Sequence, residues 1–569
     1  MEINMIRLVP AVKELSEIGG KLSKRTVKFN ASELDSRLVK ALEKLPLSED
    51  GASISINLTG GDGEGYRLSI NTDTIEIEAE CERGAFYAIQ TLRQIFKSET
   101  IPCLTIKDHP DFSYRGLYQD ITRGKVASVK TLKGLIDMAA YYKINVLQLY
   151  VEHVYEFEEC REINTEADII TAAELRELDA YCKENFIDFQ PSLSTFGHMF
   201  EILNMEKHRH LRVLKDYKTE SCRWIDRHAH HTIAPELDES FELVKSLIDQ
   251  YAPNFTSEYF NVCCDETFDL KSNYPEDVEV KLYVEFVKKI INYVKSKGKK
   301  VMMWADIILK HPEYICELPE DTIFLNWFYR PNPPEDTVAK FKELDKPQII
   351  CPGTGSWWRF CEKIDSEEAN ITQFADLGKK HGAIGVLTTN WGDWGNPASL
   401  ESASYGIMLG AAKSWAVSTE ANEEFHECAN ELLYHCPNAF DYLSEISGAM
   451  NLLNWQKFIK AAFDHRDGKE FEAPIGRAAL EEIQSIYKKI MPSLKALDWS
   501  YGDFKAEFIN TITAICVSAE LAAKLAGIEC ERLTDTEAFL KAYSEKWLEK
   551  NKASDLWRIT DILGYVESI

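Results

Sequence analysis

The sequence predicts an α/β protein built around a (β/α)8 barrel, with a small α/β domain before the barrel and a helical region after it. Between about residues 112 and 420, eight short apolar runs alternate with helical segments. Strand-like patterns disappear after about residue 420. The chain has 569 residues, and one core stops growing at about 250–300 residues. We therefore expect three domains, at residues 1–108, 109–420 and 421–569.

The first 108 residues have the pattern of a mixed α/β domain. The segments SISINLTG and DTIEIEAE alternate polar and apolar residues, as half-buried strands do. GAFYAIQTLRQIF, from Gly84 to Phe96, has the spacing of an amphipathic helix. IPCLTIKDHP follows as an extended segment that ends at Pro110.

Eight predicted strands make up the barrel. They are Gly116–Ile121, Val146–Glu152, Asp188–Ser194, Tyr259–Glu266, Val301–Ile307, Thr322–Tyr329, Gln348–Thr354 and Gly385–Trp391. The segments between them include helices such as VKTLKGLIDMAAYYK and VEVKLYVEFVKKIINYVKSKG. An open, doubly wound sheet is the alternative. It usually carries a glycine-rich phosphate turn after its first strand, and this chain has none there.

After the barrel, three segments predict helices: NEEFHECANELLYHC, LEEIQSIYKKIMPSLKAL and AEFINTITAICVSAELAAKLAG. The formal net charge is −27, which disfavours nucleic acid and anionic membranes as partners. The 14 cysteines show no paired spacing of a zinc site, so we expect reduced, buried thiols and no metal or cofactor. The N-terminus does not resemble a secretory signal, and no run of 18 apolar residues predicts a membrane span. These features favour the cytoplasm.

Aromatic and acidic residues gather at the predicted C-terminal ends of the strands, where the active sites of barrel enzymes lie. In strand order these residues are Asp120 (with Tyr114 and Arg115 before its strand), Glu152 and His153, Ser194 and His198, Asp265 and Glu266, Trp304 and Asp306, Trp327 and Tyr329, Trp357 and Trp358, and Trp391 with Asp393 and Trp394. One tryptophan is explained by core packing. Several at the same end of successive strands, together with carboxylates, favour a carbohydrate site over a phosphate site.

The adjacent acids Asp265 and Glu266 predict the catalytic centre. Neighbouring residues on a strand face opposite ways, so one of two acids inside a barrel strand would be buried at high cost. At the end of the strand both acids can reach the pocket, so neither has to be buried in the core. Retaining glycosidases usually add a second carboxylate as nucleophile. Predicted strands 6 and 7 offer no acid before Glu362. A substrate 2-acetamido group acting as the nucleophile would need none.

The chain resembles glycoside hydrolase family 20, the β-N-acetylhexosaminidases, from about residue 65 to 400. YRGLYQDITRG resembles the first strand of the family, GHMF resembles its Pro-Gly-His segment at His198, and NVCCDET resembles its Gly-Gly-Asp-Glu motif. GAFYAIQTLRQIF resembles the end of the small domain that precedes the barrel in this family. The resemblance implies retaining, exo-acting removal of terminal β-linked GlcNAc or GalNAc through an oxazoline intermediate.

The resemblance also implies residue roles. Glu266 would be the general acid/base and Asp265 the carboxylate that orients the acetamide. The implied sugar-binding residues are Arg115, His198, Trp304, Trp327, Trp391 and Asp393. Glu152, Tyr329 and Trp357 are further predicted sugar-binding residues because of their places at the strand ends, although the family usually carries aspartates where Glu152 and His153 stand. Tyr329 stands in for a tyrosine that the family carries near strand 7. Cys263 and Cys264 replace the usual glycines, Asn261 stands where a histidine is common, and Ser194 stands where an acid is common.

Three alternatives stay open at this point. One is a retaining glycosidase with a conventional carboxylate nucleophile, and another is an inactive barrel that binds glycans or a protein. The third is a metal-dependent isomerase or hydrolase that uses Glu152, His153 and His198, although no ligand spacing supports it. The expected partner is an N-acetylhexosamine-containing glycan, and we allow for a homodimer. The sequence does not separate GlcNAc from GalNAc, nor does it define the leaving group.

Overall fold

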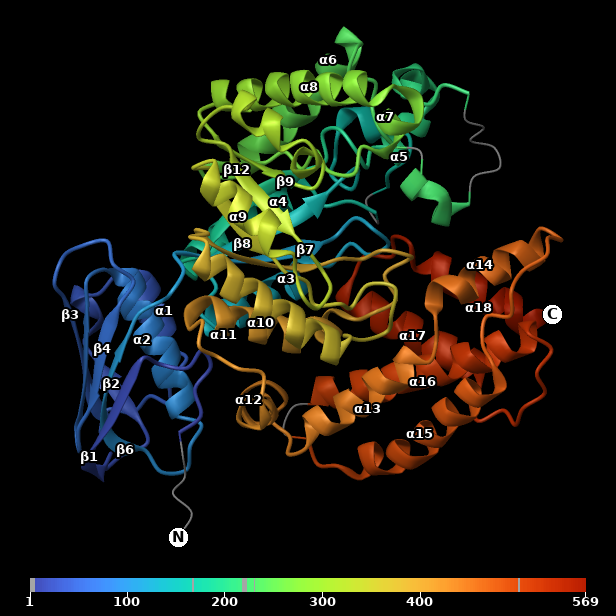
Figure 1. Cartoon of the computed structure of the whole chain (residues 1–569). Helices are drawn as coiled ribbons and strands as arrows, with labels where there is room; N and C mark the ends of the chain where they lie inside the picture. Colours follow the sequence, from blue (N-terminus) through green and yellow to red (C-terminus); the bar gives the residue numbers. More distant parts are fainter. Residues whose placement is uncertain (1–5, 166–167, 217–222, 230, 500–501) are drawn as a thin grey trace.

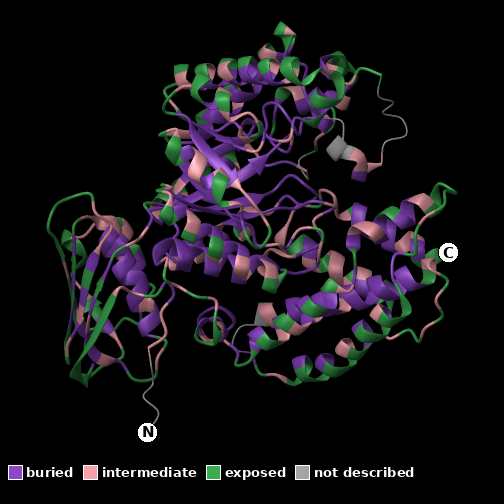
Figure 2. Cartoon of the chain, in the orientation of Figure 1, coloured by how far each residue is buried: buried purple, intermediate pink, exposed green. Residues whose placement is uncertain are grey.

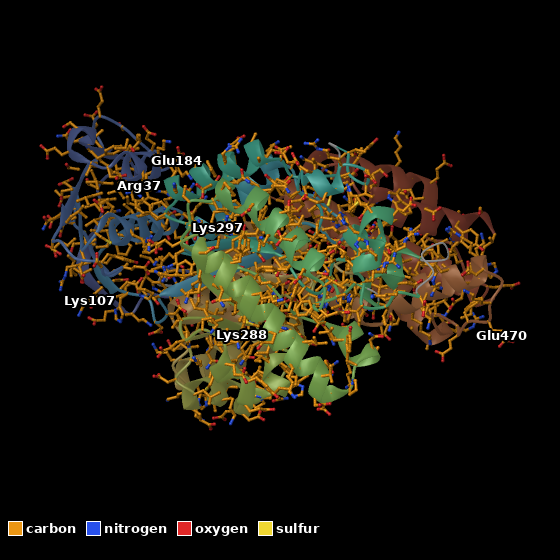
Figure 3. All side chains as sticks on the ribbon, turned by 90° about the horizontal axis from the view of Figure 1, so that it is seen from above. Arg37, Lys107, Glu184, Lys288, Lys297 and Glu470 are labelled. Carbon is orange, nitrogen blue, oxygen red and sulfur yellow. The ribbon has the colours of Figure 1, made fainter. Side chains whose placement is uncertain are left out.

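The computed structural model describes residues 6–165, 168–216, 223–229, 231–499 and 502–569, which form three parts in chain order (Figure 1). A small sheet domain comes first, a closed barrel lies in the middle, and a helical region follows. Buried residues fill the barrel and the interior of the helical region (Figure 2). The labelled charged side chains lie at the periphery, from Lys107 on the small domain to Glu470 on the helical region (Figure 3). The predicted fold class is confirmed.

The small domain is a six-stranded mixed sheet in the order β1-β6-β4-β5-β3-β2. The expected alternation is present, since Ile75, Ile77 and Ala79 of β5 are buried between exposed neighbours. Helices α1 and α2 lie against each other, and α2 packs on β3, β4 and β5. The elements are β1 (Glu14–Lys21), β2 (Val27–Phe29), α1 (Ser36–Leu42), β3 (Ala52–Leu58), β4 (Tyr66–Ile70), β5 (Thr74–Ala79), α2 (Glu82–Ile95) and β6 (Pro102–Asp108).

Eight parallel strands close the barrel, with β14 pairing back onto β7. The strands are β7 (Tyr114–Asp120), β8 (Val146–Val151), β9 (Asp188–Leu193), β10 (Tyr259–Asn261), β11 (Lys300–Trp304), β12 (Ile323–Trp327), β13 (Gln348–Cys351) and β14 (Gly385–Asn390). The helices that connect or follow them are α3 (Val129–Tyr141), α4 (Ala172–Glu184), α5 (Phe200–Asn204), α6 (Asp238–Tyr251), α7 (Phe268–Asn273), α8 (Glu276–Ser296), α9 (Glu335–Glu343), α10 (Ile364–Lys380) and α11 (Ser404–Trp415).

Several strands end earlier than the sequence predicts. The fourth was expected to run to Glu266, but β10 ends at Asn261. The fifth, sixth and seventh predicted strands also extend beyond the observed ends of β11, β12 and β13. In each case the last apolar residues of the predicted strand turn into the loop above the barrel. Buried loop residues and buried strand residues give the same apolar signal, which explains the difference.

The helical region contains α12 (Glu423–Cys428), α13 (Ala439–Asn451), α14 (Trp455–Arg466), α15 (Arg477–Ala496), α16 (Gly502–Leu525), α17 (Thr536–Lys550) and α18 (Leu556–Ser568). The helix expected over 422–436 is divided, because a π-helical turn at Ala429–Tyr434 follows α12. Within the described residues, Phe504–Leu525 of α16 is long and apolar enough to cross a membrane. Two thirds of its most apolar stretch is buried inside the protein, and an interior helix of a folded domain passes the same test.

Both flanking parts are attached to the barrel by specific contacts. At the small domain, the buried Asp108 carboxylate accepts hydrogen bonds from the Lys143 ammonium and the Trp415 indole, both at 3.0 Å. At the other end of the chain, the Ser128 N–H donates to the Lys550 carbonyl and the Lys552 N–H donates to the Val126 carbonyl. The C-terminal helices are therefore tied to the loop between β7 and α3.

Candidate active site

A cavity of about 400 Å³ opens at the C-terminal ends of the barrel strands. Carboxylates, two arginines and a wall of aromatic rings surround it. The lining residues are Arg123, Asp265, Glu266, Trp304, Trp327, Phe328, Tyr329, Arg330, Trp357, Trp358, Trp391 and Asp393. These come from the ends of β7, β10, β11, β12, β13 and β14. Its size and its mixture of aromatic and acidic groups suit one sugar ring.

The turn after β10 brings Asp265 and Glu266 to the cavity. Cys263, Cys264 and Glu266 adopt left-handed φ angles of 57°, 64° and 48°. This conformation is uncommon for residues other than glycine, which gives a physical reason for the glycines that the resembled motif carries there. Both cysteines are fully buried, so we infer that packing holds the strained turn in place. Gly197 lies directly beneath it, because a Cβ there would lie 2.2 Å from the Asp265 carbonyl oxygen.

His198 lies behind the two acids. Its Nε2 is 3.2 Å from Asp265 Oδ2 and 3.3 Å from Glu266 Oε2, and its ring stacks on His231. Burial is the largest single effect on His198 and would lower its pKa, and the Arg123 charge acts in the same direction, but the charge and hydrogen bonds of Asp265 and Glu266 together raise the pKa to about 10. Burial alone would raise the pKa of Glu266, but His198 and Arg123 bring it down to about 2. His198 thus lies between the two carboxylates at its Nε2 and the Arg123 guanidinium, 3.1 Å from its Nδ1.

Arg123 is the buried cation of the cavity. Its guanidinium donates to Asp393 Oδ1 at 2.7 Å and to Glu152 Oε1 at 3.0 Å. It also lies over the Trp391 ring, 5.0 Å from the centroid. Asp120 fixes the turn that carries it, since its Oδ1 accepts the N–H groups of Thr122 and Arg123. Arg123 thus holds Asp393 in a fixed orientation at the cavity wall.

The aromatic wall is held together by ring contacts and one hydrogen bond. The Trp391 indole N–H donates to the Tyr329 hydroxyl at 2.8 Å. Tyr329 stacks on Trp327 with ring centroids 5.0 Å apart and an interplanar angle of 16°. Trp304 is fully buried, and its Nε1 has no hydrogen-bond partner in the described part of the chain. The wall therefore offers the buried Trp304 indole N–H and the Tyr329 hydroxyl as polar groups for a bound ligand.

Asp306, from the segment after β11, supports the acid pair from below. Its Oδ2 accepts the Glu266 backbone N–H at 3.1 Å. Burial, together with the nearby charges of Asp265 and Glu266, raises the pKa of Asp306 to about 7. Asp306 therefore carries a proton over part of the neutral range and limits the negative charge that accumulates around Glu266.

The predicted catalytic and sugar-binding residues fall into three groups: those that line the cavity, those that lie behind it, and Arg115, which lies away from it. Asp265, Glu266, Trp304, Trp327, Tyr329, Trp357, Trp391 and Asp393 line the cavity. Glu152 and His198 lie behind it: Glu152 holds Arg123, and His198 contacts the acid pair.

The prediction that Arg115 binds the sugar is corrected, because the structure places this residue away from the cavity. It is fully buried near the start of β7, where it bonds Glu64 Oε2 at 2.6 Å and the Tyr87 hydroxyl at 2.9 Å. The arginine of this strand that reaches the cavity is Arg123. It stands in the same motif, YRGLYQDITRG, but after the C-terminal end of the strand. Position along the strand was the signal that separates the two arginines, since barrel sites form at C-terminal ends.

His198, Asp265 and Glu266 also bring three potential metal-ligand atoms within 4.8 Å of one another. The Arg123 guanidinium, however, lies 3.1 Å from Nδ1 of the same histidine. A fixed positive charge so close to the ring disfavours a second cation. The surroundings fit proton handling better than metal binding.

A closed barrel with an acid pair in an aromatic cavity defines the class of barrel glycoside hydrolases. Comparison with known proteins agrees: residues 112–426 match the family model of the glycosyl hydrolase family 20 catalytic domain, and residues 9–109 match domain 2 of that family. The chain belongs to glycosyl hydrolase family 20.

Individual relatives are distant. A beta-hexosaminidase of Porphyromonas gingivalis is 25% identical over 285 residues, which is 43% of this chain and 36% of the relative. The matches span about a third of the length of such curated relatives. The Vibrio harveyi exo beta-N-acetylglucosaminidase structure has a TM-score of 0.59 at 19% identity and covers 75% of this chain and 76% of its own. The Flavobacterium johnsoniae chitobiase structure has a TM-score of 0.62 at 16% identity, covering 98% and 99%. These structures share the fold.

Proposed function

We propose that this chain is a retaining, exo-acting β-N-acetylhexosaminidase that removes terminal β-linked GlcNAc or GalNAc. The observation that carries the proposal is the placement of Asp265 and Glu266 side by side at the edge of an aromatic cavity. Glu266 is the more accessible of the two, with 29% of its side chain exposed against 9% for Asp265. Glu266 therefore suits contact with the leaving-group oxygen, and Asp265 suits contact with the acetamide.

In the first step, the acetamide oxygen attacks the anomeric carbon, the bond to the leaving-group oxygen breaks, and Glu266 gives that oxygen a proton. Asp265 accepts a hydrogen bond from the acetamide N–H as positive charge develops there. The Trp304 indole N–H and the Tyr329 hydroxyl are the available donors for the carbonyl side of the acetamide. In the second step, water opens the resulting oxazoline as Glu266 takes a proton from it, and the β configuration is restored. Family 20 is known for this substrate-assisted route.

The proton of the first step has a local source. The pKa of His198 is raised to about 10 and that of Glu266 is lowered to about 2, so a proton shared by the two favours His198, whose Nε2 is 3.3 Å from Glu266 Oε2. Burial by a bound sugar removes water from the carboxylates and favours their neutral form. Transfer from His198 Nε2 to Glu266 Oε2 then prepares the general acid without a long proton path.

The test compares 4-nitrophenyl β-N-acetylglucosaminide with the matching β-glucoside. We expect hydrolysis of the acetamido substrate with retention in the first product observed by NMR, and negligible hydrolysis of the glucoside. A well-placed internal nucleophile supplies about 7–11 kcal/mol of the barrier, so its loss is severe. Glu266→Gln is expected to lower turnover of a disaccharide by at least about 10²-fold. Inversion, or similar rates on both glycosides, contradicts the mechanism and favours a carboxylate nucleophile.

A further inference from the structure

A second groove, of about 480 Å³, adjoins the mouth of the catalytic cavity. The two share Tyr329, Arg330, Trp357 and Trp358 as a common wall. The far side of the groove comes from the helical region, at the connection between α13 and α14. Because the cavity encloses one terminal sugar, the rest of a glycan has to leave through this mouth. The groove therefore lies where the leaving group of the proposed reaction would extend.

Three cations line this groove: Arg330, Arg359 and Lys363. Arg330 and Lys363 are exposed and form no ion pair with any described residue. The Arg359 guanidinium donates to Asn451 Oδ1 at 2.9 Å and to the Ser447 and Cys361 carbonyls, all of which are neutral acceptors. Lysines and arginines elsewhere in this protein commonly pair with its abundant carboxylates, as Lys489 does with Glu445. Three cations in one groove, of which Arg359 bonds neutral acceptors and the other two form no ion pair with a described residue, are unusual for a chain of net charge −27.

The acidic side chain among the described groove residues, Glu367, does not cancel this charge. It is 2% exposed, and neither of its carboxyl oxygens has a hydrogen-bond partner in the described chain. Burial raises the pKa of Glu367 well above its ordinary value, and the neighbouring Glu362 carboxylate adds to the effect. Its neutral form is therefore favoured. In that form a carboxyl group can donate a hydrogen bond to an anion.

Two helices add positive potential to the same place. The 17-residue helix α10 begins at Ile364, beside Lys363, and the 12-residue helix α14 begins at Trp455. Both starting segments line the groove. Helix N-termini carry partial positive charge and free N–H groups. These helix ends add to the positive potential that the three cations produce in the groove.

Aromatic residues connect the groove to the cavity. The Trp357 ring meets Tyr329 edge-on at a centroid distance of 5.0 Å, and the neighbouring Trp358 ring is turned 89° from it. Trp358 is 40% exposed and has a left-handed φ of 64°, a strained conformation for a bulky residue. An exposed indole next to a sugar cavity offers a stacking surface for a second sugar.

We propose that this groove selects glycans in which the sugar next to the cleaved bond carries an oxyanion, either a carboxylate or a sulfate ester. The inference rests on the proposed function and deepens it, because it names the class of leaving group. Arg330, Arg359 and Lys363 bind the oxyanion, and Trp358 stacks on the sugar that carries it.

The experiment measures kcat/KM for matched disaccharides: GlcNAc β-linked to glucuronic acid against GlcNAc β-linked to glucose, and GlcNAc β-linked to 6-sulfogalactose against the unsulfated form. We expect at least one charged substrate to be preferred by roughly threefold to tenfold at low salt, as two or three partly exposed ion pairs would give. Added sodium chloride should reduce the preference. The pair that shows the preference distinguishes a carboxylate from a sulfate.

Variants test the assignment. Lys363→Gln and Arg330→Gln are each expected to lower the ratio of charged to neutral rates, and the double variant should bring it close to one. Lys281→Gln, an exposed lysine on α8, removes the same charge elsewhere and should leave the ratio unchanged. Thermal melting reports on folding in each variant, because Arg330 also lines the catalytic cavity. Inorganic sulfate should compete with the charged substrate, whereas stimulation of the neutral one would indicate a regulatory anion and contradict the proposal.

Failure of this inference is distinguishable from failure of the proposed function. If 4-nitrophenyl β-N-acetylglucosaminide is hydrolysed normally but charged and neutral disaccharides react equally, the groove does not select anions. If the aryl glycoside is not hydrolysed at all, the proposed activity itself is wrong, and the groove has no leaving group to select. A preference that persists in the double variant places the recognition elsewhere.

Discussion

At the scale of single residues, two arginines of one sequence motif, one on β7 and one just after it, show that the position along the strand decides their function. Arg115 and Arg123 are eight residues apart, and both are buried and paired with glutamates. Arg115 joins the small domain to the barrel, whereas Arg123 lines the cavity. Both arginines stand in the same motif, so residue type and motif alone allow either one to be the sugar-binding residue. Only the direction of the strand, from its N-terminal to its C-terminal end, separates them.

His198 yields a prediction about stability and pH. Its folded pKa, about 10, lies above the ordinary value of 6.5, so its stabilising contribution is fully present below pH 6.5 and is lost as the pH rises toward 10. The pKa of Glu266 is lowered from 4.5 to about 2, so its contribution is present above pH 4.5 and is lost as the pH falls toward 2. The pair contributes in full between these ordinary values.

We therefore expect the loss of unfolding free energy in His198→Gln to be greatest between about pH 4.5 and 6.5 and to shrink toward pH 10. Urea unfolding across that range measures it. His210→Gln controls for loss of an exposed imidazole that pairs with Glu239. Nitrogen NMR of the His198 ring should show an imidazolium at neutral pH. A neutral ring there contradicts the assignment of the stored proton.

At the scale of elements, the sequence predicts the order of the barrel strands well because each is a short apolar run followed by a helix. It predicts their ends poorly. The run through Val262, Cys263 and Cys264 looks like a continuing strand, since apolar periodicity reports burial and not backbone angles. The sequence indicated the left-handed turn at Cys263 and Cys264 only through the family resemblance, because the resembled motif carries glycines at these two positions.

The aromatic wall behaves as one element, and its hydroxyl can be tested separately from its rings. Tyr329→Phe keeps the stacking on Trp327 but removes the acceptor of the Trp391 indole N–H and the proposed donor to the acetamide. We expect kcat/KM on the aryl N-acetylglucosaminide to fall by roughly 10²-fold, as for loss of one preorganised donor. Melting should change little, because the net contribution of one hydrogen bond is about 0.5–1.5 kcal/mol.

Tyr181→Phe is the matched control, because its hydroxyl bonds Asp137 on the outer helices of the barrel. It should keep full activity. If Tyr329→Phe also keeps full activity, the carbonyl of the acetamide is held by another group, and the Trp304 indole N–H is the next candidate.

At the scale of the whole molecule, charged residues buried between the domains link the small domain to the barrel. Arg115→Gln leaves Glu64 without its closest cation, and breaking a buried pair typically costs about 3–5 kcal/mol. We expect a lower melting temperature with unchanged kcat per folded molecule. Arg83→Gln removes the other arginine that contacts Glu64, but its side chain is 43% exposed, so about 0–1 kcal/mol is expected. A catalytic defect in Arg115→Gln that exceeds the loss of folded protein would contradict this structural role and support a role for Arg115 in the active site.

The attachment of the last helices to the loop after β7 has a consequence for how the protein is made. Val126 and Ser128, only a few residues after Arg123, bond the backbone of Lys550 and Lys552. Ribosomes make the loop more than 400 residues before they make its partners. Until those partners emerge from the ribosome, the segment beside Arg123 lacks the contacts that hold it. Nascent barrels that stop short of Lys550 should accordingly be inactive, which separates the time at which the strands are made from the time at which the site is held in place.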